Sequence, residues 1–289
     1  MTTLYEGAFA KVNLTLDVLG KREDGYHDLQ SVMQTISIRD DVEIDVGTGK
    51  PWTLECSREE LPQGEENLAW KAAKIFCDTM KIDPDGLAIR ITKRIPSGAG
   101  MGGGSADAAA VLRGLNRAFD NRLSAERLEE LAAEVGSDVA FCVRGGTMLA
   151  HGRGELLSEL PDMPKCIFVI CKPQFSISTP ELFRKLDQVS LRRHPDTAGL
   201  ISALEQGNLR ELCCRMYNVF EDVNDRRMRT VAAIKSVLID KGALGAVMTG
   251  TGSAVFGVFS DKTEAEGARE ELKREHGFCC LAECVGRLI

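Results

Sequence analysis

The sequence predicts an α+β protein built from two lobes, and three observations support this fold class. Strand-like and helix-like segments are mixed in both halves of the chain, without the steady alternation that a doubly wound parallel sheet shows. A glycine-dense loop at 96–105 leads into an alanine-rich segment at 106–115. The length of 289 residues fits two domains, or one large domain with two lobes. A Pro-containing connection near 155–165 places the boundary, so the predicted lobes are 1–158 and 159–289.

The first half of the chain begins with a strand that places two polar residues side by side. Apolar and polar residues alternate over 12–18, which predicts a half-buried strand. The same period places Lys11 and Asn13 on one face. The other elements predicted in this half are strands at 29–38, 42–46 and 87–91 and helices at 67–80, 106–115 and 125–135, the last two with Ser105 and Ser124 as N-caps.

The second half of the chain predicts a further set of mixed elements. Charged and apolar residues at helical spacing indicate an amphipathic helix at 262–275. The turn Thr-Gly-Thr-Gly-Ser at 249–253 separates two apolar segments of strand length. The predicted elements are strands at 166–171, 243–248, 254–259 and 278–285, and helices at 180–188, 199–220, 226–240 and 262–275.

The composition is that of an ordinary globular protein. Hydrophobic residues make up 44% of the chain and charged residues 27%, which excludes a disordered chain, a collagen and a coiled coil. The net charge of −7 argues against a nucleic-acid partner but not against a phosphorylated small ligand. No apolar run reaches about 18 residues and the N-terminus lacks a signal-peptide pattern, so we expect a cytoplasmic protein without a membrane partner. The ten Cys lack zinc-ligand spacing, which predicts reduced thiols packed as small apolar side chains.

The glycine loop has the properties of a phosphate-binding segment. Gly98, Gly100 and Gly103 satisfy the dinucleotide pattern G-x-G-x-x-G, but Pro96 interrupts the approach and no second strand with an acidic end follows. A Walker-type loop is excluded as well, because no Lys precedes Ser105. Glycines let a ligand approach the backbone, and the following helix N-terminus adds partial positive charge, so the loop suits an oligophosphate. The alternative is a flexible loop that packs closely on a sheet.

Four regions of the chain carry a resemblance to a known family. The loop Pro96-Ser-Gly-Ala-Gly-Met-Gly-Gly-Gly-Ser-Ala-Asp-Ala-Ala109 resembles the ATP-binding motif of the GHMP kinases, which include galactokinase and the homoserine, mevalonate and phosphomevalonate kinases. The resemblance implies a two-lobe GHMP kinase fold with an N-terminal ATP-binding lobe like domain 2 of ribosomal protein S5, a ferredoxin-like C-terminal lobe and an active site between them. The supporting segments are Ala8-Phe-Ala-Lys-Val-Asn-Leu-Thr-Leu16 with Asp24-Gly-Tyr-His27, Gly136-Ser-Asp-Val-Ala-Phe141, and Met248-Thr-Gly-Thr-Gly-Ser-Ala-Val-Phe256.

The segments outside the glycine loop resemble one branch of this family, whose members phosphorylate a cytidine-diphosphate-linked methylerythritol. The implied reaction is ATP-dependent phosphorylation of its 2-hydroxyl, giving ADP and the 2-phosphate, in the non-mevalonate route to isoprenoid precursors. The implied cofactors are ATP and Mg²⁺, the implied partner is a small molecule, and a monomer or homodimer is expected. Three alternatives stay open: a GHMP kinase of the homoserine or mevalonate type, an inactive GHMP-like binding module, and a dinucleotide-dependent oxidoreductase.

Lys11 and Asp138 are the candidate catalytic residues. Phosphoryl transfer needs mainly positioning and charge stabilisation, plus a group that takes the proton of the nucleophile. A carboxylate can accept that proton, and a neighbouring ammonium stabilises the charge that grows on the attacking oxygen. From the residues alone, a solvated strand lysine and a helix N-cap aspartate are equally good interpretations. The resemblance implies catalytic roles for both.

The resemblance also assigns candidate binding residues. Tyr26 and Phe183 are expected to form two walls of a cytidine pocket, with His27 hydrogen-bonded to the base. Ser105 is expected near Mg²⁺ or a phosphate, and the role of Asp107 is left open. The nucleotide-binding candidates are Asn67, Lys93, Pro96, Ser97, Gly98, Ala99, Gly100, Met101, Gly102, Gly103, Gly104, Ser105 and Ala106, and the substrate-binding candidates are Asn13, Tyr26, His27, Thr179, Phe183 and Gly252.

Overall fold

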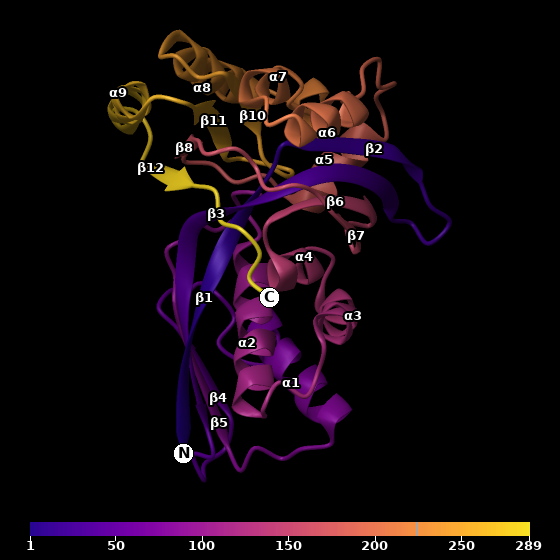
Figure 1. The fold of residues 1–289 in the computed structure, drawn as a ribbon, viewed down its shortest axis with the longest axis vertical. Helices are drawn as coiled ribbons and strands as arrows, with labels where there is room; N and C mark the ends of the chain where they lie inside the picture. Colours follow the sequence, from indigo (N-terminus) through magenta and orange to yellow (C-terminus); the bar gives the residue numbers. More distant parts are fainter. Residues whose placement is uncertain (224) are drawn as a thin grey trace.

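The computed structural model describes residues 1–223 and 225–289 and confirms the α+β class. The N-terminal lobe holds one large mixed sheet covered by helices, and the C-terminal lobe holds a smaller antiparallel sheet (Figure 1). The N-terminal elements are β1 (Thr2–Asn13), β2 (Thr15–Lys21), β3 (His27–Val46), β4 (Thr53–Cys56), α1 (Leu68–Met80), β5 (Leu87–Thr92), α2 (Gly103–Ala118), α3 (Ala125–Val135), α4 (Val139–Arg144), β6 (Thr147–Gly152) and β7 (Leu156–Glu159).

Strand β3 is the central strand of the large sheet. Its 20 residues pair with β1 and β2 along one edge and with β5 and β6 along the other, all antiparallel. The separate strands predicted at 29–38 and 42–46 are therefore wrong, because the polar residues between them do not end the strand. Asp40 is fully buried there, and its carboxylate accepts hydrogen bonds from the backbone N–H groups of Arg94 and Ile95.

The strand predicted at 12–18 is buried on both faces rather than on one. The polar side chains of Lys11, Asn13, Thr15 and Asp17 are all at most 4% exposed. The C-terminal lobe covers this face of the sheet, which borders a cavity between the lobes. The alternation of apolar and polar residues therefore does not mean that the polar face is exposed to solvent. The chain leaves β1 and enters β2 across a single residue, and a predicted single strand becomes two.

Helix α2 lies directly against the large sheet. Every residue from Ala106 to Asn116 is buried. A Cβ at Gly114 would lie 2.6 Å from Ile44 Cδ1, so a larger residue there would force the Ile44 side chain to move where the helix crosses β3. The alanine-rich sequence permits this close packing because short side chains bring the helix near the strands.

The helix caps agree with the sequence at α3 and differ at α2. Ser124 Oγ accepts a hydrogen bond from the N–H of Arg127, as expected for the N-cap of α3. The N-cap predicted at Ser105 is wrong, because α2 begins two residues earlier after Gly102, which has a φ of 70°. Ser105 instead lies in the first turn of the helix, which leaves its hydroxyl available for another role.

The C-terminal lobe contains a four-stranded sheet in the order β10-β11-β8-β12. The long helix predicted at 199–220 is wrong, because Gly207 (φ 65°) ends a first helix and Asn208 caps a second. The elements are β8 (Ile167–Lys172), α5 (Thr179–Leu186), α6 (Thr197–Glu205), α7 (Leu209–Cys214), β9 (Tyr217–Asn218), the 3₁₀ turn η1 (Val219–Asp222), α8 (Met228–Asp240), β10 (Gly245–Met248), β11 (Val255–Phe259), α9 (Lys262–Lys273) and β12 (Phe278–Glu283).

The lobes are tied together at several places. The short strand β9 pairs parallel with β2, so a piece of the C-terminal half extends the large sheet. The segment after β12 returns to the N-terminal lobe beside α4 (Figure 1), where the N–H of Val285 donates to Thr35 O and the N–H of Leu288 donates to Arg144 O. Within the two described ranges, no helix has both the length and the apolar composition needed to cross a membrane.

Candidate active site

The glycine loop is anchored between β1 and the turn that joins β10 to β11. The backbone N–H of Lys11 donates to Met101 O at 3.1 Å, and the N–H of Ala254 donates to Ala99 O at 3.1 Å. The loop therefore follows a defined path across the boundary between the lobes.

Gly100 allows the closest approach in this contact. Its φ is +74°, and a Cβ built there would lie 2.2 Å from Thr249 O. We expect Gly100→Ala to lower the free energy of unfolding by at least about 2 kcal/mol, since left-handed strain alone costs about 1–2 kcal/mol and the turn must also move. Chemical denaturation measures this loss. Gly104→Ala is the matched control, because its Cβ would make only ordinary contact with Leu68; equal stability of the two variants would contradict the prediction.

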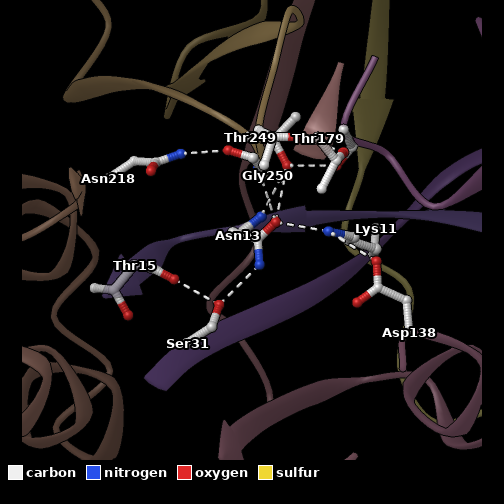
Figure 2. Close-up of polar contacts among 11 residues, drawn as sticks. Lys11, Asn13, Thr15, Ser31, Asp138, Thr179, Asn218, Thr249 and Gly250 are labelled. Atoms are coloured by element: carbon white, nitrogen blue, oxygen red, sulfur yellow. Dashed lines mark hydrogen bonds and ion pairs between the residues drawn. The ribbon is translucent and has the colours of Figure 1, made fainter. Parts of the chain in front are cut away.

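A buried hydrogen-bond network centred on Asn13 fixes the lysine of β1 (Figure 2). Asn13 Oδ1 accepts from Lys11 Nζ at 2.7 Å and from the N–H of Gly250 at 3.0 Å. Thr249 Oγ1 lies 3.2 Å from the same oxygen, and Asn13 Nδ2 donates to Ser31 Oγ at 2.8 Å. The ammonium of Lys11 is thus held by Asn13, which residues of both lobes hold in turn, and it points toward Asp138 (Figure 2).

Asp138 stands directly before α4, but its carboxylate does not cap that helix. In the described part of the chain, α4 has no side-chain cap hydrogen bond. Asp138 Oδ2 lies 3.4 Å from Lys11 Nζ, and the Asp138 side chain is 35% exposed where the Lys11 side chain is 4% exposed. The solvated lysine and the capping aspartate that the sequence left open are therefore both inconsistent with this geometry. The arrangement presents a carboxylate to the cavity with a buried cation beside it.

Helix α4 is itself fixed at its far end. The buried guanidinium of Arg113 on α2 donates to Cys142 O at 2.7 Å and to Gly7 O at 2.8 Å. The returning C-terminal segment adds the hydrogen bond from Leu288 to Arg144. These contacts set the position of α4, and with it that of Asp138.

Two cavities meet at the glycine loop. The larger, of about 770 Å³, lies between the lobes and contains Lys11 and Asp138. The smaller, of about 290 Å³, lies against α1 and includes Asn67. Gly100 and Gly102 line both, so a ligand in the smaller cavity can extend past the loop toward the Lys11–Asp138 pair.

The predicted site residues divide between these cavities, with two exceptions. Ala106 and Gly252 line neither. The larger cavity brings together Lys11, Asn13, Tyr26, His27, Gly100, Gly102, Ser105, Asp138, Thr179 and Phe183. The smaller brings together Asn67, Lys93, Pro96, Ser97, Gly98, Ala99, Gly100, Met101, Gly102, Gly103 and Gly104.

On the side of the smaller cavity, Lys93 is buried between two carboxylates. Its Nζ forms ion pairs with Asp40 and Asp107, and the Lys93 side chain is 3% exposed. Nζ also lies 3.4 Å from Gly103 O, at the start of α2. Burial raises the pKa of Asp107 to about 7, against the opposing effect of Lys93. Lys93 thus connects the end of β5 to the glycine loop.

The residues present offer few ligands for Mg²⁺. Within the described ranges, no group of three or more His, Cys, Asp or Glu could hold a metal ion. Asp107 is buried and paired, whereas the oxygen donors that line the larger cavity include the Ser105 hydroxyl and the Asp138 carboxylate. This set fits an ion that arrives with the phosphates of a nucleotide, since Mg²⁺ usually takes one or two protein ligands and keeps phosphate oxygens and waters.

The aromatic residues expected to bind a base lie at the far end of the larger cavity, in an unexpected arrangement. The rings of His27 and Phe183 are stacked, with centroids 4.7 Å apart and planes at 27°. Tyr26 is exposed and packs under the guanidinium of Arg153, 5.2 Å from its ring centroid. The imidazole, rather than the Tyr26 ring, covers Phe183 in this structure. A base that stacks on Phe183 therefore has to lie beside His27 or displace it.

Comparison with known proteins identifies the family. Residues 67–146 match the family model described as the GHMP kinases N terminal domain, and 200–277 match GHMP kinases C terminal. A 4-diphosphocytidyl-2-C-methyl-D-erythritol kinase of Clostridium botulinum (strain Langeland) is 42% identical over 93% of this chain and 95% of its own length. The kinase of the same name from Syntrophomonas wolfei is 43% identical over 92% of this chain and 93% of its own.

The chain belongs to the 4-diphosphocytidyl-2-C-methyl-D-erythritol kinase family. A crystal structure of a 4-(cytidine 5'-diphospho)-2C-methyl-D-erythritol kinase superposes with a TM-score of 0.81 at 30% identity, covering 98% of this chain and 100% of that one. A homoserine kinase from Cytophaga hutchinsonii gives a TM-score of 0.78 at 17% identity over 99% and 96% of the two chains, and that likeness concerns the fold alone. Overall shape therefore does not separate the 4-diphosphocytidyl-2-C-methyl-D-erythritol kinase family from other GHMP kinases, whereas sequence identity does.

Sequence reasoning missed two residues that support the site of this 4-diphosphocytidyl-2-C-methyl-D-erythritol kinase family member. Ser31 holds Asn13, and Asp40 holds Lys93. Ser31 lies inside the strand predicted at 29–38, where a polar residue was the available signal. Asp40 lies in the charged run 39–41, which gave no such signal.

Proposed function

We propose that this chain phosphorylates the 2-hydroxyl of 4-diphosphocytidyl-2-C-methyl-D-erythritol (CDP-methylerythritol) with ATP, giving ADP and the 2-phosphate. The observation that carries the proposal is the buried Lys11 ammonium 3.4 Å from the Asp138 carboxylate, in the cavity that the glycine loop borders. The curated kinases of this name, more than 40% identical over most of the chain, support the choice of acceptor. The product belongs to the non-mevalonate route to isoprenoid precursors.

In this proposal Asp138 takes the proton of the acceptor hydroxyl. Its carboxylate is partly exposed to the larger cavity, where an acceptor can reach it, and makes no cap bond with α4. A base within hydrogen-bond reach of the hydroxyl lets the oxygen attack the γ-phosphorus as the proton leaves. Asp138 then carries the proton until it is lost to solvent.

Lys11 stabilises the charge that develops on the attacking oxygen and on the transferred phosphoryl group. The ammonium is held by Asn13 Oδ1 at 2.7 Å, so it needs no reorganisation during the reaction. Its burial strengthens the electrostatic interaction with a nearby oxyanion relative to the same pair in water.

ATP is proposed to lie in the smaller cavity, with its phosphates passing over the glycine loop toward Lys11. The loop glycines and the N-terminus of α2 offer backbone N–H groups and a positive dipole end to the phosphates. When bound with the nucleotide, Mg²⁺ would supply positive charge that offsets the charge of the phosphates. Ser105 is the residue that would hold this ion. Asn67 and Lys93 border the space for the nucleoside.

A coupled assay of ADP release with and without CDP-methylerythritol tests this function. The proposal expects release that depends on CDP-methylerythritol and is weak with homoserine or mevalonate. Release with one of those two alcohols instead would favour another GHMP kinase activity, and no release with any acceptor would favour an inactive binding module.

The aromatic side chains at the far end of the cavity make a second prediction. Stacking on an aromatic ring contributes about 1–3 kcal/mol per base. We expect Tyr26→Ala and Phe183→Ala each to raise the KM for CDP-methylerythritol by about 5- to 150-fold, at 1.4 kcal/mol per tenfold, and to leave the KM for ATP unchanged. Steady-state kinetics with both substrates measure this. Unchanged KM for the cytidine substrate in both variants, or a change for ATP instead, contradicts the assignment.

The proposal also covers the setting of the enzyme. We propose 1–158 as the ATP-binding lobe and 159–289 as the C-terminal lobe, because the two family matches lie on either side of this boundary and β7 ends at Glu159. We further propose a cytoplasmic monomer or homodimer that acts on a small molecule without a nucleic-acid partner.

A further inference from the structure

A cluster of charged and aromatic residues joins the lobes at the far end of the larger cavity. His27 Nε2 lies 2.6 Å from Asp187 Oδ1, and Lys21 Nζ lies 2.7 Å from Asp187 Oδ2. The Phe183 ring is stacked on the imidazole. All four residues line the cavity. The mechanism proposed above uses neither Asp187 nor Lys21.

Local structure explains why these four side chains meet. Lys21 and His27 are cross-strand partners at the end of the β2–β3 hairpin. Phe183 and Asp187 are four residues apart, on α5 and at its C-cap, so they lie on the same side of the helix. The hairpin of the N-terminal lobe thus contacts one side of α5 in the C-terminal lobe. The His27 ring packs on the Phe183 ring, and the Asp187 carboxylate faces the nitrogens of Lys21 and His27.

The carboxylate determines which nitrogen of a neutral His27 carries the proton. An ionised carboxylate only accepts hydrogen bonds, so Nε2 must be the protonated nitrogen when it faces Asp187. The hydrogen bond from Lys21, and then that from His27, hold the pKa of Asp187 below its usual range. Nδ1 is left with a lone pair, and it has no hydrogen-bond partner among the side chains and backbone groups that the structure describes.

We propose that Asp187 is a positioning residue that holds His27 in the Nε2–H tautomer, so that Nδ1 accepts from the exocyclic amine of a cytosine and disfavours uracil. Cytosine presents an N4 amine on the edge where uracil presents a carbonyl oxygen, and two acceptors facing each other cannot form a hydrogen bond. The inference rests on the proposed function, since it names how the same site selects its base.

The tautomer of His27 gives a direct readout that does not require turnover. Two-bond ¹H–¹⁵N spectra of the imidazoles, with His27 assigned through His27→Gln, are expected to show the Nε2–H form at about pH 8. Asp187→Asn is expected to give a mixture of both tautomers, because an amide can either accept or donate. A dominant Nδ1–H form in the unmodified protein, or no change in Asp187→Asn, overturns the proposal.

Substrate selection gives the second readout. We expect Asp187→Asn to lower the ratio of kcat/KM for CDP-methylerythritol over its uridine analogue by at least about 5-fold, from the usual cost of one lost base contact. The change is expected in the KM of the cytidine substrate, with the KM for ATP constant. Equal losses for both analogues indicate a merely structural role and overturn the inference.

Lys21→Gln is the matched control, because it removes the other partner of Asp187 and leaves the contact with His27. It is expected to keep both the tautomer and the base ratio. Titration with CMP and UMP separates this inference from the proposed function. If no acceptor is phosphorylated, the function fails, but a shift of the His27 resonances by CMP and not by UMP still supports the base contact. Equal shifts with both nucleotides overturn it.

Discussion

Asp138→Asn is expected to lower kcat by about 10²- to 10⁴-fold, the usual contribution of a general base. The amide keeps the shape of the side chain but cannot accept the proton of the acceptor hydroxyl. The KM for ATP is expected to stay constant, because Asp138 lies in the larger cavity and does not line the smaller one. Single-turnover measurement of ADP formation isolates the chemical step.

Asp78→Asn is the matched control for this substitution. Asp78 forms an exposed ion pair with Lys74 on α1 and lines neither cavity. The control is expected to retain full activity. If Asp138→Asn retained near-normal turnover as a folded protein, Asp138 would not be the base.

Lys11→Met is expected to lower kcat by about 10²- to 10³-fold, comparable with the loss of one preorganised electrostatic contact in a buried site. Methionine keeps the apolar stem that packs near Gly102, so the folded structure is expected to persist. The acceptor oxygen of Asn13 keeps its bond from Gly250. Circular dichroism and thermal unfolding check the fold, and steady-state kinetics check the loss.

The double variant tests whether Lys11 and Asp138 act as a unit. If they share one step, the Lys11→Met/Asp138→Asn enzyme is expected to be about as active as the less active of the two single variants. Its loss of kcat is then smaller than the product of the two single losses. Additive losses would mean that the two residues act in separate steps, and Lys74→Met provides a neutral lysine control on α1.

The sequence predicted the elements whose signal is local. Helix α3 has a serine cap, an apolar face and a terminal glycine, and the structure reproduces all three. Strands β10 and β11 were found because an obvious glycine turn separates two apolar segments. Each of these signals depends only on neighbouring residues, so a single sequence carries it.

The errors arise where distant residues decide the outcome. A charged run at 39–41 ends a strand in an average protein, but here Asp40 is satisfied by backbone N–H groups of Arg94 and Ile95 and by Lys93. The helix predicted at 199–220 also extends too far at its C-terminal end, because 217–218 form β9, whose partner is β2 in the other lobe. The local sequence pattern shows neither the partners of Asp40 at 93–95 nor the pairing of β9 with β2.

The candidate site shows the same division. The glycine loop was evident from composition alone, and the period of β1 correctly placed Lys11 and Asn13 on one face. The proximity of Lys11 and Asp138 needed either the family resemblance or the structure, because β1 and the start of α4 are distant in the sequence and meet only in the folded chain. The stacking of His27 on Phe183 was not expected, since the resemblance implied Tyr26 and Phe183 as the two walls and His27 as the hydrogen-bonding edge of the pocket.

The continuity of β3 has a consequence for the length of the acceptor. His27 is the first residue of this strand, and Ser31, which supports the Asn13–Lys11 network, lies four residues further on. At about 3.3 Å per residue these positions are about 13 Å apart along one continuous strand, which pairs with β2 over 27–30 and with β6 from Leu29 onward. A long acceptor can contact both positions at once, and binding at one position raises the effective concentration of its other end at the second position. A short alcohol of homoserine size reaches only one of the two positions.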